Sequence, residues 1–372
     1  MCNQEFPVQI SDPGIAVPGR QSPSAQSASA RLGGSEYAEL SRLVREAGLL
    51  HRRTLYYTWK IVVTVGALAG GWAAFVVVGN SWWTLAVAGL LAVLFTQMGF
   101  LGHDAGHRQI FGSRRSSYIA GVLMGNLGIG LSYGWWVAKH NRHHAHPNTE
   151  GADPDIATGA LIFTATEVNA PRGLVRVIRR YQAYLFFPML LLEGVNLHLA
   201  SVRALAGRRT SPRRRTEAAL LAAHFGSYLA LVVVVLGPGL KAVAFVMVQQ
   251  GIFGLYLGCS FAPNHKGMPV LTATDRSDFL RRQVLTSRNI RGGWLTDLAL
   301  GGLNYQIEHH LFPSVPRPSL RRCQPLIRAF CEERGLTYCQ TSLAGSFASV
   351  LGHLNSVGRP GGARRAAAGT AP

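Results

Sequence analysis

Long apolar runs without charge alternate along the chain with strongly polar segments. Four of these runs have about 18 residues or more, which is enough to cross a bilayer. They cover residues 61–78, 83–102, 220–236 and 242–262. Only a few residues separate the first run from the second and the third from the fourth. The pattern therefore predicts two transmembrane helical hairpins with a long segment between them.

Two further segments in the middle of the chain are apolar, but neither resembles a simple span. Residues 118–136 are uncharged but contain five glycines, and residues 181–199 carry Glu193 and His198. If both crossed the bilayer, the basic segment between them would lie on the outer side, against the usual distribution of charge. We therefore predict that both are helices lying in or dipping into the membrane interface.

The excess of basic residues supports this topology. The chain has 37 Lys and Arg against 18 Asp and Glu, a formal net charge of +19. Such a charge is typical of proteins that bind nucleic acid or an anionic membrane surface. The two short connections hold a single basic residue, Lys241, whereas the termini and the middle segment are basic. The positive-inside rule predicts that these basic parts are cytoplasmic, in a bacterial inner membrane or its equivalent, and that nucleic acid is not a partner.

The two ends of the chain lack the apolar residues that a folded core requires. Residues 1–40 and 341–372 contain stretches rich in Ser, Pro, Gly and Ala. Such compositions are typical of disorder. We predict a disordered N-terminal tail over residues 1–40, one membrane domain over residues 41–340, and a mostly disordered tail over residues 341–372.

Seven of the 13 histidines fall into three short groups. The groups are HDAGH with His103 and His107, HNRHH with His140, His143 and His144, and QIEHH with Gln306, His309 and His310. His146, two residues after the second group, is an extra candidate. Residues three or four apart share one face of a helix, whereas adjacent residues diverge by about 100 degrees. One HxxxH pair is weak evidence, but three groups that the topology places on one face of the membrane predict a metal centre.

The number of imidazoles indicates more than one metal ion. A structural zinc site is complete with about four ligands, so seven or eight histidines suit two metals that keep open positions. Imidazole binds iron, copper, nickel and zinc, so the ligand type leaves the metal open. Neutral imidazoles are required, so activity is expected to fall in acid. Carboxylates often orient such ligands, and Asp104, Asp155 and Glu308 are candidates beside Glu150, Asp153 and Asp297. The ordinary alternative is a solvated or capping carboxylate.

The three groups together resemble the histidine boxes of the membrane fatty acid desaturases. The stretch LNYQIEHHLFP resembles the front-end and related bacterial acyl desaturases. The resemblance implies an all-α integral membrane fold in which four spans and interfacial helices carry a cytoplasmic helical cap with two iron ions. It also implies that His265, in PNHKG, is a further ligand and that Asn264 holds a metal-bound water. Gln306 replaces a histidine of the family, so we expect a weak or water-mediated ligand there.

The resemblance also implies the reaction. A methylene has no acidic proton or leaving group, so its C–H bond requires a metal–oxygen oxidant. The implied enzyme uses O2 to introduce a cis double bond into a fatty acyl chain carried by coenzyme A or a lipid. Electrons are expected from a separate ferredoxin- or cytochrome-type donor with its NAD(P)H reductase, because the HPGG signature of a fused haem domain is absent.

Several alternatives remain open from the sequence. A lipid hydroxylase of the same histidine-box superfamily would have the same ligands. A membrane metal transporter or haem protein is more remote, because a transporter carries its ligands at mid-membrane. His198 and His224 lie on apolar helices and are predicted to be hydrogen-bonded core residues. The aromatic residues Tyr133, Trp135 and Trp136 either line an acyl tunnel or anchor the interface.

Overall fold

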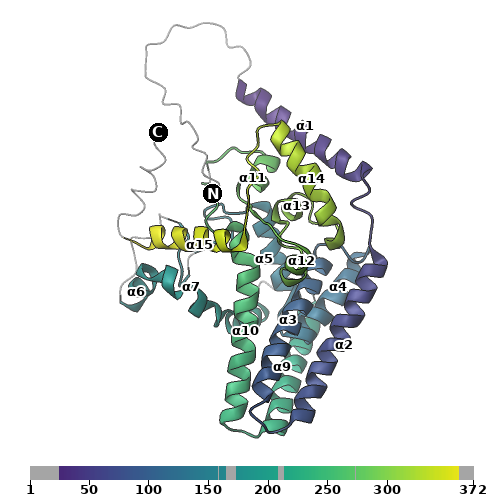
Figure 1. Cartoon of the computed structure of the whole chain (residues 1–372), viewed down its shortest axis with the longest axis vertical. Coiled ribbons are helices and arrows are strands. Elements are labelled where there is room, and N and C mark those ends of the chain that lie inside the picture. Colours follow the sequence, from purple (N-terminus) through teal and green to yellow (C-terminus); the bar gives the residue numbers. More distant parts are fainter. Residues whose placement is uncertain (1–24, 158, 165–172, 208–212, 273, 360–372) are drawn as a thin grey trace.

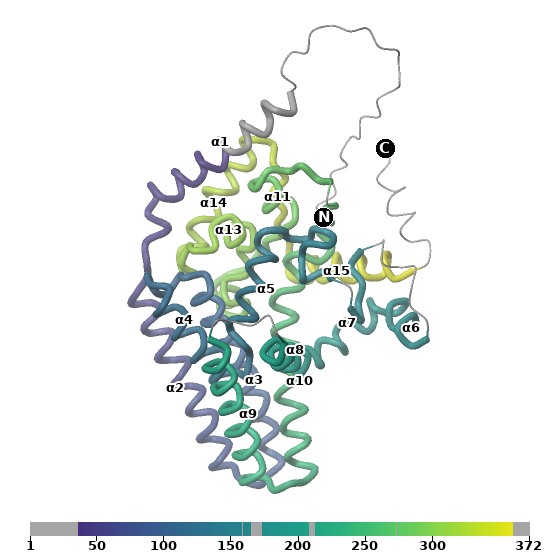
Figure 2. Tube along the Cα trace, turned by 180° about the vertical axis from the view of Figure 1, so that it is seen from behind, coloured from purple at the N-terminus to yellow at the C-terminus, as the bar shows by residue number. Residues whose placement is uncertain are grey.

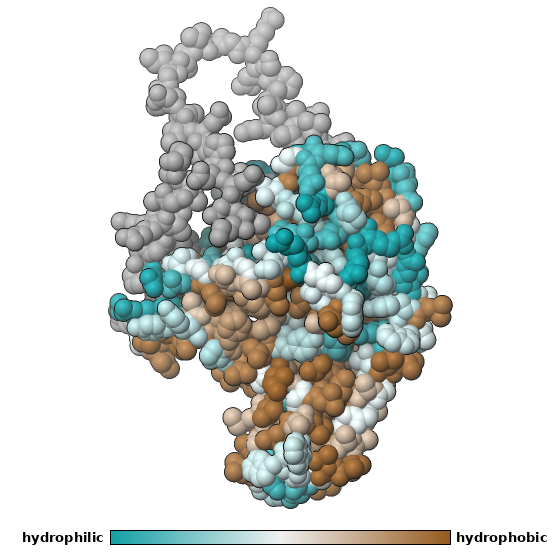
Figure 3. Space-filling model, viewed as in Figure 1, coloured by the Kyte–Doolittle hydropathy of each residue, from teal (hydrophilic) through white to brown (hydrophobic). Residues whose placement is uncertain are grey.

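The computed structural model describes residues 25–359 apart from 158, 165–172, 208–212 and 273, and it describes side chains from Glu36 onward. The described chain is mostly helical and has almost no strands. Figure 1 shows a long bundle of helices below a broader group of shorter ones. The lower bundle presents apolar residues over most of the visible surface, whereas hydrophilic residues gather on the upper part (Figure 3). This division is expected for a protein partly embedded in lipid.

Four helices are long and apolar enough to cross a membrane. They are α2 (Thr54–Val78), α3 (Thr84–Gly106), α9 (Arg214–Leu236) and α10 (Leu240–His265), and each contains one of the four predicted apolar runs. The helices are joined in pairs by short connections at the same end of the bundle (Figure 1). Buried aromatic residues, among them Phe75, Phe95 and Phe253, form the core between them. The predicted pair of hairpins is confirmed.

The segment between the hairpins is built from short helices. Helix α4 (Arg114–Val122) continues as the π-helix η1 (Leu123–Gly128), and after a break the chain enters α5 (Tyr133–Ala145). Beyond α6 (Leu174–Arg180) come α7 (Gln182–Leu190) and α8 (Glu193–Ala206), which are bent by 71° relative to each other. As one broken segment, this pair would be a fifth candidate span. Figure 2 shows α6 to α8 at the level where the bundle meets the cap.

The cap consists of helices from both ends of the described chain. The C-terminal half contributes α11 (Phe279–Leu285), α12 (Trp294–Ala299), α13 (Gln306–Leu311) and α14 (Arg317–Glu333), and the N-terminal part contributes α1 (Ala25–Glu46). Leu40, Leu280, Ile307 and Ile327 belong to its separate hydrophobic core. Two short strands, β1 (Asn289–Ile290) and β2 (Gln340–Thr341), pair in parallel beside it. A helical cap was predicted, and the structure contains one.

The structure corrects the expected extent of the tails. Helix α15 (Leu343–Gly358) occupies part of the segment that we expected to be mostly disordered. Its side chains Val350 and Leu354 are buried in a small core with Phe186. The apolar residues of this segment recur at helical spacing, which its many small residues obscure. Helix α1 likewise covers the second half of the predicted N-terminal tail. Residues 1–24 and 360–372 lie outside the described chain.

Candidate metal centre

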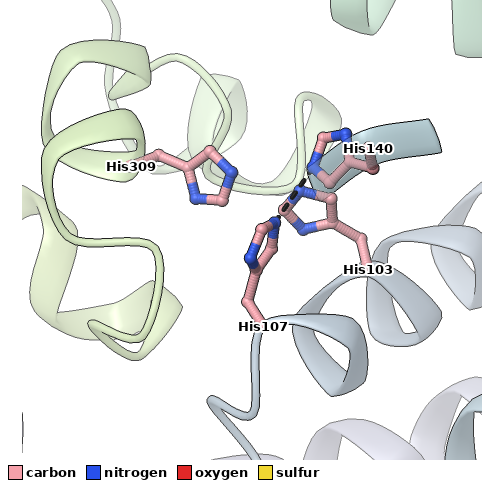
Figure 4. Close-up of side chains that lie close together, drawn as sticks. All are labelled: His103, His107, His140 and His309. Atoms are coloured by element: carbon pink, nitrogen blue, oxygen red, sulfur yellow. Dashed lines mark hydrogen bonds between the residues drawn. The ribbon is translucent and has the colours of Figure 1, made fainter. Parts of the chain in front are cut away.

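Four histidines from three separate elements converge where the bundle meets the cap. His103 lies in the last turn of α3 and His107 directly follows this helix, whereas His140 comes from α5 and His309 from α13. Figure 4 shows the four imidazoles grouped around a common centre. The Nε2 atoms of His107 and His140 are 2.9 Å apart. One nitrogen from each of the four rings lies within 4.8 Å of one from every other ring. We call these four residues the first histidine group, as distinct from the three groups HDAGH, HNRHH and QIEHH in the sequence.

A second histidine group lies beside the first. It consists of His143 of α5, His265 at the end of α10, and His310 of α13. The Nε2 atoms of His143 and His265 are 3.3 Å apart. His144 lies between the groups, because its Nε2 is 3.1 Å from that of His140 while its ring stacks on His310 at a centroid distance of 4.2 Å. The eight predicted histidines therefore form one continuous cluster.

The spacing of these nitrogens fits metal coordination. Metal–imidazole bonds of about 2.0–2.1 Å place two donors at right angles about 3 Å apart, which matches the observed separations of 2.9, 3.1 and 3.3 Å. Nitrogen atoms of His103, His144, His309 and His310 are also buried without a hydrogen-bond partner among the described residues. Unpaired buried polar atoms are costly. A metal ion in each group would satisfy the Nε2 atoms of His103, His309 and His310.

Helices α3, α5 and α13 determine which group each histidine joins. Residues i and i+4 share a helix face, so α3 directs both His103 and His107 into the first group. The adjacent residues of α13 diverge, and His309 joins the first group while His310 joins the second. Within α5, His140 belongs to the first group and His143 to the second. His146, which follows α5, is exposed and lies outside both groups.

Burial keeps these imidazoles in the neutral form that binds metals. The pKa of His140, His309 and His310 is held well below the usual value of 6.5, first because burial penalises the charged ring and then because neighbouring histidines repel a second charge. The pKa of His107 and His144 is lowered for the same reasons. A lone pair is therefore available on these rings at neutral pH.

Among the carboxylates near the cluster, Asp153 has the shortest contact with a histidine. Both oxygens of Asp153 lie 3.0 Å from Nδ1 of His143, which leaves Nε2 of that ring facing His265. Asp153 also accepts a hydrogen bond from the backbone N–H of Asn148, so a tight turn holds it in place. A carboxylate behind a metal-binding imidazole fixes its tautomer and orientation. Asp153 lies ten residues after His143, and no spacing rule distinguishes it from its acidic neighbours.

The three carboxylates that were expected to orient histidines have different surroundings. Asp104 lies 3.4 Å from Nδ1 of His103 and forms an ion pair with the buried Arg317 at 2.7 Å. Asp155 is 3.5 Å from Nδ1 of His143 and 2.5 Å from the ammonium of Lys139. Glu308 does not contact a histidine in this way. Its carboxylate accepts hydrogen bonds from the Asn289 amide and the Tyr338 hydroxyl, because its position on α13 directs it into the cap.

Two amide side chains adjoin the second histidine group. Gln306 Nε2 is 2.8 Å from His265 Nε2, and Asn264 Nδ2 donates to Gln306 Oε1 at 3.1 Å. The Oδ1 atom of Asn264 is buried without a hydrogen-bond partner among the described residues. The second group has three histidines against four in the first. The two amides therefore lie where a further ligand or a bound water would complete it.

The histidine cluster opens onto a large apolar cavity. The cavity has a volume of about 630 Å³, and His103, His140, His143 and His265 line one part of its wall. Most of the remaining wall is apolar, and the three aromatic residues that were considered as a tunnel wall belong to it. The lining includes Ile129, Leu131, Tyr133, Trp135, Trp136, Leu257 and Phe261. This volume lies within the range of about 300–1,000 Å³ that is usual for ligand pockets.

Two histidines outside the boxes, on the apolar helices α8 and α9, are hydrogen-bonded core residues, as predicted. His198 Nδ1 donates to the carbonyl of Gly130 at 2.8 Å, and His224 Nδ1 donates to the carbonyl of Leu127 at 2.8 Å. Both side chains are buried. Neither belongs to a histidine group.

Fold and site together define a helical membrane protein with a histidine cluster able to bind metal beside an apolar cavity. The sequence matches the fatty acid desaturase family over residues 80–342, so this chain belongs to that family. It is 32% identical over 331 residues to an acyl-lipid (9-3)-desaturase of the moss Physcomitrium patens, an alignment that covers 87% of this chain and 62% of the moss protein. The chain thus spans less than two thirds of that relative.

Two further relatives carry related names. A delta(8)-fatty-acid desaturase of Helianthus annuus is 29% identical over 338 residues, which are 86% of this chain and 72% of that protein. A delta(5) fatty acid desaturase of Caenorhabditis elegans is 30% identical over 313 residues, which are 81% of this chain and 69% of the relative. The regions aligned with each relative are long enough to include the membrane helices and the histidine groups.

Proposed function

We propose that this protein is an O2-dependent desaturase that introduces a cis double bond into a fatty acyl chain. The observation that carries the proposal is the opening of two adjacent histidine groups onto one apolar cavity. A cavity of this kind accepts a hydrocarbon chain, and the adjacent histidines suit a pair of metals. The relatives named as desaturases support the same reading.

Two iron ions are the proposed cofactors. The first would be held by His103, His107, His140 and His309, with His144 as the remaining donor, and the second by His143, His265 and His310. Asn264 and Gln306 would hold a water or act as weak ligands beside the second ion. Iron bound there would supply the oxidising power toward O2 that cleavage of an unactivated C–H bond requires.

The chain's own residues provide the surroundings of this reaction. The apolar wall would hold the acyl chain and exclude water, with Trp136 and Phe261 close to the histidine groups. Asp153 would hold the proton on Nδ1 of His143, so that Nε2 stays free for the metal. The ion pair between Asp104 and Arg317 would fix the end of α3 against α14.

The carrier, the electron donor and the topology complete the proposal. Two relatives are named acyl-lipid desaturases, which supports an acyl chain esterified to a membrane lipid, with coenzyme A as the other carrier. A ferredoxin- or cytochrome-type protein with its NAD(P)H reductase would supply electrons from the cytoplasm. The basic flanks of the spans support cytoplasmic termini and a cytoplasmic metal centre.

The experiment combines product analysis with metal analysis. The protein is expressed in a host with a known fatty acid profile, and mass spectrometry locates any new double bond. The expected result is one new unsaturated acid together with about two irons per purified chain, as the two histidine groups require. An alcohol without an alkene would indicate a hydroxylase. Zinc or haem in place of iron would refute the proposal.

A further inference from the structure

The break between η1 and α5 leaves backbone groups without helical partners deep inside the protein. We call residues 127–134 the interruption. Gly130 has a φ of +71°, and a Cβ atom there would come within 2.6 Å of His224 and 2.9 Å of His198. Only glycine fits this conformation and this close approach. Irregular backbone at membrane depth is stable only where other parts of the protein satisfy its polar groups.

Side chains from α8 and α9 satisfy most of these groups. The carbonyls of Leu127 and Gly130 accept hydrogen bonds from His224 and His198, each at 2.8 Å. The backbone N–H of Ser132 donates to the hydroxyl of Ser201 at 3.0 Å. The N–H of Tyr133 donates to Asn126 of η1 at 3.0 Å, so partners come from three elements.

Glu217 binds the start of α5 directly. Its Oε2 accepts a hydrogen bond from the Ser132 hydroxyl at 2.8 Å and another from the backbone N–H of Gly134 at 3.1 Å. The side chain of Glu217 is completely buried, although it lies in the first turn of the candidate span α9. Buried acidic residues in spans are costly and usually have a role. A carboxylate at a helix N-terminus is stabilised by the free N–H groups and the helix dipole.

The interruption connects the cavity to the histidine groups. Ile129, Leu131 and Tyr133 line the cavity. Eight residues after Ser132, about two helical turns, α5 presents His140, followed by His143 and His144. Any shift of the interruption therefore moves the cavity wall and the histidines of α5 together relative to those on α3 and α13.

We propose that Glu217, His198 and His224 are positioning residues that fix the interruption and thereby determine which methylene of the acyl chain lies next to the metal centre. The proposal rests on the proposed desaturase function. None of the three residues contacts the histidine groups or the cavity, so their effect passes through the backbone of residues 127–134 and through α5. When this segment is less firmly held, the acyl chain can bind in more than one position relative to the metal centre.

The test compares Glu217→Ala with Glu217→Gln. Alanine removes the acceptor of both hydrogen bonds, whereas the glutamine oxygen still accepts them. Thr84→Val is the control, because it removes a hydrogen bond of a buried side chain, to the carbonyl of Ser81, at the connection between α2 and α3 and away from the interruption. Each full-length protein is purified and titrated with Co²⁺, whose absorption spectrum reports the ligand geometry. Each is also expressed in the same host for location of the product double bond.

The expected result is that Glu217→Ala spreads the double bond over neighbouring positions, lowers turnover per bound iron at least tenfold, and changes the Co²⁺ spectrum. Glu217→Gln is expected to restore the single position, and Thr84→Val to leave it unchanged. Where Glu217→Ala yields no folded protein, Ser201→Ala decides, because it removes the acceptor of the Ser132 N–H and, besides that, a hydrogen bond within α8 to the carbonyl of Leu197.

Two results would overturn the inference. One is a folded Glu217→Ala or Ser201→Ala protein with the wild-type double-bond position and Co²⁺ spectrum. The other is a Thr84→Val protein that shows the same spread of positions, because loss of any hydrogen bond of a buried side chain would then be equivalent. Failure of the wild-type protein to make a double bond would instead refute the proposed function.

Discussion

His107 and His140 are 33 positions apart in the sequence, yet their Nε2 atoms lie 2.9 Å from each other. One directly follows α3, and the other belongs to α5. At this distance two neutral imidazoles can form one N–H···N hydrogen bond, whereas a metal ion between them would bind the lone pairs of both rings. The pair therefore links the first and second histidine boxes in one site.

Replacing a clustered histidine should remove metal, whereas replacing an exposed histidine outside the cluster should not. We expect His107→Ala to lower iron binding and to reduce desaturation by more than the roughly 10–100-fold that loss of an outer partner causes. His146→Ala is the control, because His146 lies two residues after the second box but is exposed. Iron per chain and product yield are measured for both. Equal iron and activity in the two variants would contradict the assignment of His107.

Loss of Asp153 should lower iron binding or activity more than loss of Asp155, although the sequence analysis favoured Asp155. Asp153 contacts Nδ1 of His143 through both oxygens at 3.0 Å, whereas Asp155 lies 3.5 Å away and also pairs with Lys139. Asp153→Asn should lower iron affinity or activity by about 10–100-fold, and Asp155→Asn by less. Titration of the metal-free proteins with Fe²⁺ measures the difference. A larger loss in Asp155→Asn would reverse the assignment.

Filling the cavity should shorten the acyl chains that the protein accepts. Gly99 lines the cavity, and a Cβ there would make only ordinary contacts with Ile129 and Leu257. Gly99→Leu should therefore place its side chain in the cavity and favour shorter over longer substrates. Gly70→Leu is the control, since a Cβ at Gly70 meets nothing within 4 Å. The measurement is the ratio of short to long unsaturated products. An unchanged ratio in Gly99→Leu would show that the acyl chain lies elsewhere.

The buried ion pair between Arg317 and Asp104 should be important for stability. Both side chains are almost fully buried, and the closest atoms are 2.7 Å apart. Loss of one partner leaves an uncompensated charge, which costs about 3–5 kcal/mol. Arg317→Gln should therefore lower the midpoint of thermal unfolding in detergent. Arg328→Gln, which breaks an exposed pair with Glu332, should leave it unchanged. Equal midpoints for the two variants would contradict this account.

The sequence predicted the parts of the fold that depend on local pattern. The four spans are visible as uncharged runs, and α2, α3, α9 and α10 contain them. The helical spacing within HDAGH likewise predicted that His103 and His107 share a face, whereas His140 and His143, three residues apart in HNRHH, join different groups. Local pattern failed at α15, where small residues hid the apolar face that packs on Phe186.

Contacts that depend on the tertiary fold could not be predicted from the sequence. Glu308 is adjacent to His309, yet its carboxylate bonds to Asn289 and Tyr338, because sequence proximity does not determine direction. Asp153 is held beside His143 by a turn that no sequence pattern predicts. Glu217 binds the start of α5, 85 positions from Ser132. Such partners follow from how the helices pack and not from periodicity.

Locating the metals in the purified protein tests the central claim most directly. The iron-loaded protein is crystallised, and anomalous diffraction is recorded at the iron absorption edge. The account predicts two peaks, one among His103, His107, His140 and His309 and the other among His143, His265 and His310. A single peak, or peaks away from these imidazoles, would contradict it.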